Sequence, residues 1–226
     1  LPTMIIYTER AMGNKEIPTE IEGIPVHEEV VGVVEPLSYK GQPLAAKNPK
    51  TGTPSGSTSP SPTDRITRPV PIGSATSNWY DCGSATIGVR VRRGDALFVI
   101  SNNHVFGRLN NAVAGELILQ PGRSDVSCAQ EATDEVGRVV DVHPIVFSTS
   151  YDNTMDAAMA STTSSLISNS TPGDGYGIPS STIAGAYIGM PVQKYGRSSR
   201  LTDGKVSAIN VIIGINYWCG SARFVN

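Results

Sequence analysis

Cysteine, aromatic residues and charge are all scarce in this 226-residue sequence. It contains 3 cysteines, 6% aromatic residues and 17% charged residues, with a net charge of -2. The cysteines lack C-x-x-C spacing, which argues against a metal site, and no cofactor is implied. One disulfide with a free thiol and three buried thiols are both compatible with this count. The absence of a basic stretch argues against nucleic acid or an anionic membrane as a partner.

Long apolar runs and helical periodicity are also missing. No run approaches the roughly 18 residues that are needed to cross a bilayer. The opening LPTMIIYTER has no basic region followed by a long apolar core, so the given residues include no signal peptide. The chain does not begin with Met, so a leader could have been removed, and both the cytoplasm and the secreted compartment stay open as locations. No stretch shows a convincing apolar stripe with a period of 3.6 residues, so the sequence does not indicate a helical protein.

Turn-forming residues and short β-like runs dominate instead, with 23 glycines and 16 prolines. Short strands without intervening helices are typical of a sandwich or barrel, so we expect a mainly β fold. The stretch Gly189–Val206 is typical of a strand, a polar hairpin and a second strand. The candidate strands of the longest region are Ala85–Arg92, Leu97–Ser101, Glu116–Leu119, Glu135–Val142, Ala157–Met159, Pro191–Tyr195, Lys205–Ile215 and Ala222–Val225.

Composition divides the chain into three zones. Residues 1–40 hold β-like runs at Met4–Tyr7 and Ile24–Val34 but are too few to bury a core alone, so we expect them to dock elsewhere or to cover a cleft as a propeptide would. Residues 41–66 contain 16 Gly, Pro, Ser or Thr among 26 residues, which is typical of a linker. Residues 67–226 form the main domain.

Only one of the three histidines has a context that favours function. His27 lies beside two glutamates in a β-like run, which favours a solvent-facing strand residue. His143 precedes a proline, which favours a structural role. His104 follows a strand that ends in Ser101-Asn102-Asn103, and functional residues concentrate where rigid elements end.

A carboxylate that could partner this histidine begins the run Asp156-Ala-Ala-Met-Ala160. A buried carboxylate is costly unless it is hydrogen-bonded, and an imidazole N–H is a suitable donor. The alternative is an aspartate that bonds its own backbone at the start of a strand. Asp152 is the competing partner for the histidine, although its polar surroundings indicate greater exposure.

Seven segments, in this order, resemble those of trypsin-like serine peptidases, in particular the bacterial branch related to the plant narrow-leaf protein. The N-terminal GIPVHEEVVG also looks like the short region that precedes such domains. The seven segments are Arg68–Gly73, Cys82–Gly88, Ser101–Val105, Gln120–Gly122, Val136–Gly137, Asp156–Ala160 and Gly189–Val206.

The resemblance implies a chymotrypsin-like double β-barrel, with the second barrel incomplete in this chain and a small N-terminal segment appended. It also implies peptide-bond hydrolysis through an acyl-enzyme, with an extended polypeptide as substrate. His104 would be the general base and Asp156 its orienting partner.

The nucleophile of this family lies in a G-D-S-G motif, which the sequence does not contain. We therefore expect the serine downstream of residue 226 and expect the chain as given to be an inactive fragment. Its own C-terminal segment or another chain would complete the second barrel. Two internal candidates, Ser221 and Cys219, lack the G-x-S/C-G pattern, and a turn serine and a buried strand cysteine are the favoured interpretations.

Two other interpretations stay open. The first is a non-catalytic module that binds peptides or proteins on the same fold. The second is a structural β-domain in which the histidine and aspartate segments match by coincidence. The separation of His104 and Asp156 discriminates, because coincidental segments would lie too far apart for a hydrogen bond.

Overall fold

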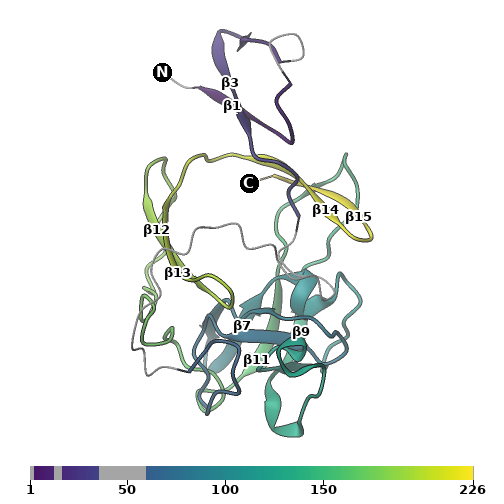
Figure 1. Cartoon of the computed structure of the whole chain (residues 1–226), viewed down its shortest axis with the longest axis vertical. Coiled ribbons are helices and arrows are strands. Elements are labelled where there is room, and N and C mark those ends of the chain that lie inside the picture. The colour runs from purple at the N-terminus through teal and green to yellow at the C-terminus, as the bar shows by residue number, and fades with distance from the viewer. Residues whose placement is uncertain (1–2, 13–16, 36–59, 226) are drawn as a thin grey trace. The chain divides into compact units, whose positions relative to one another are not determined.

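The computed structural model describes residues 3–12, 17–35 and 60–225, which form two compact units (Figure 1). The first unit takes its described residues from 1–36, 146–154 and 207–226, and the second takes them from 37–145 and 155–206. The strands are β1 Met4–Thr8, β2 Glu20–Ile21, β3 Ile24–Val30, β4 Ala75–Asn78, β5 Ala85–Thr86, β6 Val89–Arg93, β7 Ala96–Ser101, β8 Leu117–Leu119, β9 Glu135–Val142, β10 Asp152–Asn153, β11 Ala158–Thr162, β12 Pro191–Gly196, β13 Arg200–Lys205, β14 Ile212–Tyr217 and β15 Gly220–Val225. The helical elements are the short turns η1 Asn103–Gly107, η2 Arg123–Val126 and η3 Ala132–Asp134.

The second unit is built on a curled seven-stranded sheet in the order β5-β4-β8-β9-β11-β7-β6 (Figure 1). All of its neighbouring strands are antiparallel. Val99 of β7 lies opposite Ala160 of β11, and both side chains are fully buried. Gly137 of β9 has no room for a side chain, because a Cβ there would lie 2.6 Å from the carbonyl oxygen of Ser161. The mainly β fold class is confirmed.

Most of the predicted strands are present, and two of them are broken. Ala85–Arg92 is split at Ile87 and Gly88, where the backbone N–H of Gly88 donates to the carbonyl of Ile100. Lys205–Ile215 contains the end of β13 and the start of β14, and Asn210 between them has a positive φ of 56°. A backbone hydrogen bond to a neighbouring strand in the first place, and a left-handed residue in the second, thus accompany the break in a run of strand-forming residues.

Strand β4 was not predicted, because its sequence Ala-Thr-Ser-Asn lacks the apolar alternation of a strand. All four of its residues are nevertheless buried. Their polar groups are satisfied internally: Thr76 Oγ1 donates to the carbonyl of Leu119 at 2.8 Å, and Asn78 Nδ2 donates to the carbonyl of Phe106 at 2.9 Å. These hydrogen bonds offset the desolvation of the side chains.

Downstream of β11, the described residues form small sheets rather than a closed second barrel. β12 and β13 pair only with each other, which confirms the hairpin predicted for Gly189–Val206. Its buried Tyr195 donates from Oη to Oδ1 of Asp174 at 2.8 Å, and Arg200 binds the other oxygen of that carboxylate. Burial and this carboxylate raise the pKa of the Tyr195 hydroxyl.

The first unit contains two three-stranded sheets, in the orders β1-β3-β2 and β10-β15-β14. The N-terminal segment contacts the C-terminal hairpin through the backbone N–H of Asn216, which donates to the carbonyl of Val34 at 3.1 Å. Tyr217 packs edge-on against Phe147 and also contacts Phe224. The propeptide-like role of residues 1–40 stays a prediction.

The predicted linker, residues 41–66, lies largely outside the described residues. Residues 60–66, at the end of the predicted linker, pack within the second unit. The backbone N–H of Ala75 donates to the carbonyl of Pro62 at 2.8 Å, and the Ile66 side chain joins the core. No helix in the described residues is long and apolar enough to span a bilayer.

The cysteine pairing left open by the sequence is a disulfide between Cys82 and Cys128, whose Cα atoms are 5.5 Å apart. Cys219 is a free, exposed thiol in the turn between β14 and β15, so the interpretation as a buried strand residue was wrong. Ser221 lies in β15 rather than in a turn, and its Oγ donates to Oδ1 of Asn216 at 2.6 Å. The turn of this hairpin ends before Gly220, so it lies earlier in the sequence than we expected.

An ion pair joins Arg65 to the nearly fully buried Asp134 within the second unit. Arg65 donates to both carboxylate oxygens of Asp134, at 2.8 and 2.9 Å, and the backbone N–H of Glu131 donates to Oδ2 at 2.8 Å. Burial by itself would raise the pKa of Asp134. The hydrogen bonds from Arg65 and the backbone outweigh burial, so the pKa of Asp134 lies below its ordinary value.

We expect Asp134→Asn to lower the free energy of unfolding by about 2 kcal/mol at neutral pH, because it removes charge-assisted hydrogen bonds. A carboxylate with a lowered folded pKa contributes stability above its ordinary pKa of about 4 and loses that contribution as the pH falls through the folded pKa. The difference between wild type and variant should therefore shrink below about pH 4. Urea unfolding across this range measures it. The exposed Asp95→Asn variant is the control, and a pH-independent difference would contradict the role of the ion pair.

Thiol titration tests the cysteine assignment. The unreduced protein should expose one thiol to a disulfide-exchange reagent, and the reduced, denatured protein should expose three. Cys219→Ser should abolish the first signal. A reactive thiol that persists in this variant would show that Cys82 and Cys128 are not joined.

Candidate functional site

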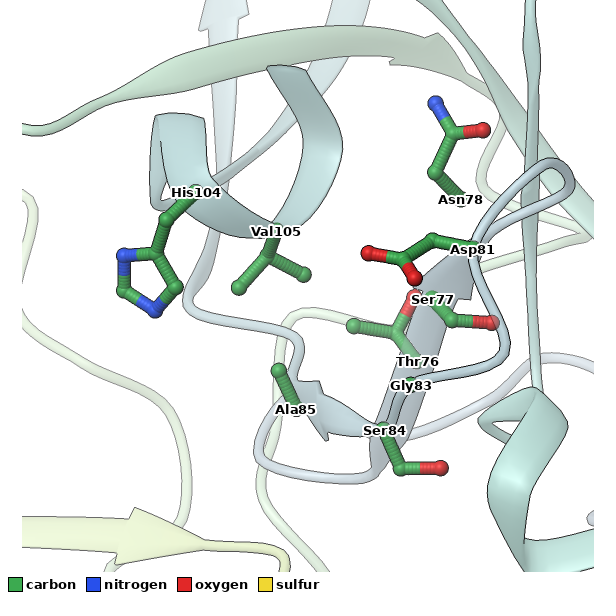
Figure 2. Close-up of a pocket in the computed structure, with 9 residues that line it drawn as sticks. All are labelled: Thr76, Ser77, Asn78, Asp81, Gly83, Ser84, Ala85, His104 and Val105. Carbon is green, nitrogen blue, oxygen red and sulfur yellow. The ribbon is translucent and has the colours of Figure 1, made fainter. Parts of the chain in front are cut away.

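His104 is carried by η1, the π-helical turn that follows β7. Val105 and Phe106 of this turn are buried in the core, which fixes the turn to the sheet. Figure 2 shows the imidazole of His104 and the side chain of Val105 leaving the same turn in different directions. The apolar pair thus anchors the element while the histidine stays at the surface of the core, with 13% of its side chain exposed.

Asp156 lies two residues before β11, the strand that pairs antiparallel with β7. In this register, Ala158 lies opposite Ser101. The chain that enters β11 and the chain that leaves β7 therefore meet at the same end of these two neighbouring strands. Sequence reasoning selected both residues but could not give the register that brings them together.

The imidazole and the carboxylate are in direct contact. Nδ1 of His104 lies 2.5 Å from Oδ2 of Asp156, and the backbone N–H of His104 donates to Oδ1 at 3.1 Å. Only 12% of the Asp156 side chain is exposed, so water screens the interaction weakly. The aspartate thus binds both the imidazole and the backbone of the histidine.

This geometry has a chemical consequence for the neutral imidazole. When Nδ1–H donates to Asp156, the lone pair of the ring lies on Nε2. The carboxylate also stabilises the imidazolium that forms when Nε2 accepts a proton. The pair can therefore act as an oriented base at Nε2.

The other sequence candidates lie elsewhere. His27 is an exposed residue of β3 in the first unit, and His143 is exposed at the end of β9. Asp152, the competing carboxylate, lies in β10 of the first unit and pairs with Arg223 at 2.7 Å. Among the candidates, the structure brings together His104 and Asp156.

A shallow pocket lies beside His104 and Val105, on the side of the turn that faces β4 (Figure 2). Its wall includes residues on both sides of Cys82, so the disulfide to Cys128 tethers the loop that forms this wall. The lining side chains are mostly small and polar. They belong to Thr76, Ser77, Asn78, Asp81, Gly83, Ser84, Ala85, His104 and Val105.

The structure also describes the surroundings of the His104–Asp156 pair. Within the described ranges, no group of three or more His, Cys, Asp or Glu side chains is placed to bind a metal ion. Sequence reasoning gave no role to Asn102, whose Nδ2 donates to the carbonyl of Asp156 at 3.1 Å. The only available signal was its position, two residues before the histidine.

No protein family and no curated protein matches the sequence. Among solved structures, a glutamic acid-specific serine protease, described as using a novel histidine triad in substrate binding, is 20% identical with a TM-score of 0.42. That similarity covers 68% of this chain and 69% of the protease. A homolog of alpha-lytic protease is 18% identical with a TM-score of 0.42, over 68% of each chain. These similarities assign no family, activity or site to this chain.

The tautomer of His104 tests the geometry of the pair. We expect the neutral ring to be mostly the Nδ1–H form in the wild type. In Asp156→Asn, the backbone N–H of His104 retains the amide oxygen, so the amide NH₂ faces Nδ1 and selects the Nε2–H form. Long-range ¹H–¹⁵N spectra of the imidazoles measure this change, and His27 in the same sample is the control. The same tautomer in wild type and variant would exclude the hydrogen bond.

Proposed function

We propose that this chain carries the general base of a trypsin-like serine endopeptidase. The observation that carries the proposal is the 2.5 Å contact between Nδ1 of His104 and Oδ2 of Asp156. In this proposal, His104 is the base and Asp156 orients it. The substrate is an extended polypeptide, and the serine nucleophile is supplied by residues that follow Asn226.

The proposed reaction follows from the chemistry of the pair. Nε2 of His104 accepts the proton of the serine hydroxyl as its oxygen attacks the carbonyl carbon of the peptide bond. Asp156 stabilises the resulting imidazolium, which then donates the proton to the departing amine. Water hydrolyses the acyl-enzyme in the reverse order of proton transfers. Each step requires Nδ1 to stay bound to Asp156.

The order of the sequence segments supports the same proposal. The histidine segment precedes the aspartate segment, as in chymotrypsin-type peptidases and unlike subtilisin or the α/β-hydrolases. Ser221 and Cys219 do not provide a better nucleophile. Ser221 is a strand residue bonded to Asn216, and Cys219 lies in a hairpin turn.

A peptidyl phosphonate that labels active-site serines tests the proposal on the protein extended beyond residue 226. We expect labelling of the extended protein and none of residues 1–226. His104→Ala should slow labelling by about 10⁴-fold, because the base is lost. His27→Ala removes an exposed histidine of the first unit and is the matched control.

Equal labelling of wild type and His104→Ala would overturn the proposed role of the histidine. An extended protein that binds extended peptides but is neither labelled nor able to cleave them would support the alternative of a non-catalytic binding module. In that case, peptide binding should be unchanged by His104→Ala.

A further inference from the structure

Two asparagines, Asn103 and Asn110, are joined by two hydrogen bonds next to His104. Nδ2 of Asn103 donates to Oδ1 of Asn110 at 2.7 Å, and the backbone N–H of Asn110 donates to Oδ1 of Asn103 at 3.0 Å. Asn103 is completely buried and directly precedes the histidine. A buried amide with satisfied hydrogen bonds holds a single orientation, because any other would leave dry polar groups. We call these residues the asparagine pair.

The asparagine pair closes a strained turn. Arg108, Leu109 and Asn110 have φ values of 47°, 55° and 71°, so three consecutive non-glycine residues occupy the left-handed region. Such backbone persists only where its surroundings hold it in place. Gly107 must also lack a side chain, because a Cβ there would lie 2.4 Å from Oδ1 of Asn103. The Asn103 amide thus contacts the chain both at the end of η1 and in the strained turn that follows it.

The same pair is connected to the segment that carries Asp156. Nδ2 of Asn103 also donates to the carbonyl of His143 at 2.7 Å. The backbone N–H of His143 in turn donates to the carbonyl of Ala157 at 2.9 Å, one residue after Asp156. The histidine turn and the entry to β11 are therefore both bound to the strand end at residue 143.

Asn110 strengthens this connection two residues further along the chain. Its Nδ2 donates to the carbonyl of Ile145 at 2.7 Å, and its Oδ1 accepts the backbone N–H of Ile145 at 2.9 Å. The side chain of Asn110 therefore pairs with both polar backbone groups of one residue, as a neighbouring strand would. The segment from 143 to 145 cannot move without disturbing the asparagine pair.

We propose that Asn103 and Asn110 are positioning residues that set the contact between His104 and Asp156. They act through the backbone of η1 and of residues 143–145. The consequence for catalysis rests on the proposed function, whereas the effect on the His104–Asp156 contact does not. The competing explanation is that the pair only stabilises the fold.

Asn103→Asp tests this role with little change of volume. The carboxylate can still accept from Asn110 but has lost the donors to Asn110 Oδ1 and to the His143 carbonyl. We expect the Nδ1–H tautomer of His104 to lose its majority, as read from long-range ¹H–¹⁵N spectra of residues 1–226. In the extended protein, phosphonate labelling should slow by about 10–100-fold, the usual effect of removing a supporting hydrogen bond.

Asn153→Asp is the matched control. Asn153 is also buried, and its Nδ2 donates to two backbone carbonyls, those of Val146 and Arg223, in the first unit. This variant should lose stability while the tautomer of His104 is unchanged. Should Asn103→Asp fail to fold, Asn110→Ala decides, because Asn110 is exposed and its loss disturbs the core less.

The outcomes separate the two proposals. A folded Asn103→Asp or Asn110→Ala variant with the wild-type tautomer would overturn the positioning role. The same tautomer change in Asn153→Asp would also overturn it, because a general loss of stability would then be the cause. A wild-type protein that is never labelled counts against the proposed function alone, since the tautomer still reports on the asparagine pair.

Discussion

The antiparallel register between β7 and β11 is the constraint from which the candidate site follows. It places Ala158 opposite Ser101 and buries Val99 against Ala160. A slip by one residue would turn these core residues to the solvent, so the hydrophobic core opposes it. The end of one strand and the approach to the other are thereby brought to one point. The register that packs the core thereby also brings the imidazole and the carboxylate together.

Buried amides and carboxylates then convert this coarse placement into defined geometry. The sheet fixes which segments are neighbours, but the position of an irregular turn depends on hydrogen bonds that have few alternatives. Asn78, Asn103 and Asp134 each make several such bonds within the second unit. These three polar residues therefore act where a strand or a turn ends, whereas apolar residues pack along most of the strands.

Sequence patterns predicted strands in which apolar residues recur. One of them, Glu135–Val142, is β9 with the predicted boundaries. They failed for β4, because a strand stabilised by polar side chains leaves no periodic signal. His104 and Asp156 could be proposed from their segments, but their contact depends on strand register, which a single sequence does not encode locally. The asparagine pair was out of reach for the same reason, since its partners at 143 and 145 are distant in the chain.

The position of β11 within the sheet has a consequence for the order of folding. It lies between β7 and β9, although both of those strands precede it in the chain. During synthesis, β7 and the histidine turn emerge first, and the gap between the strands closes only when β11 arrives. Until then, His104 is an ordinary imidazole without an orienting carboxylate. Completion of the sheet and formation of the His104–Asp156 contact are thus one event, and a half-folded chain lacks that contact.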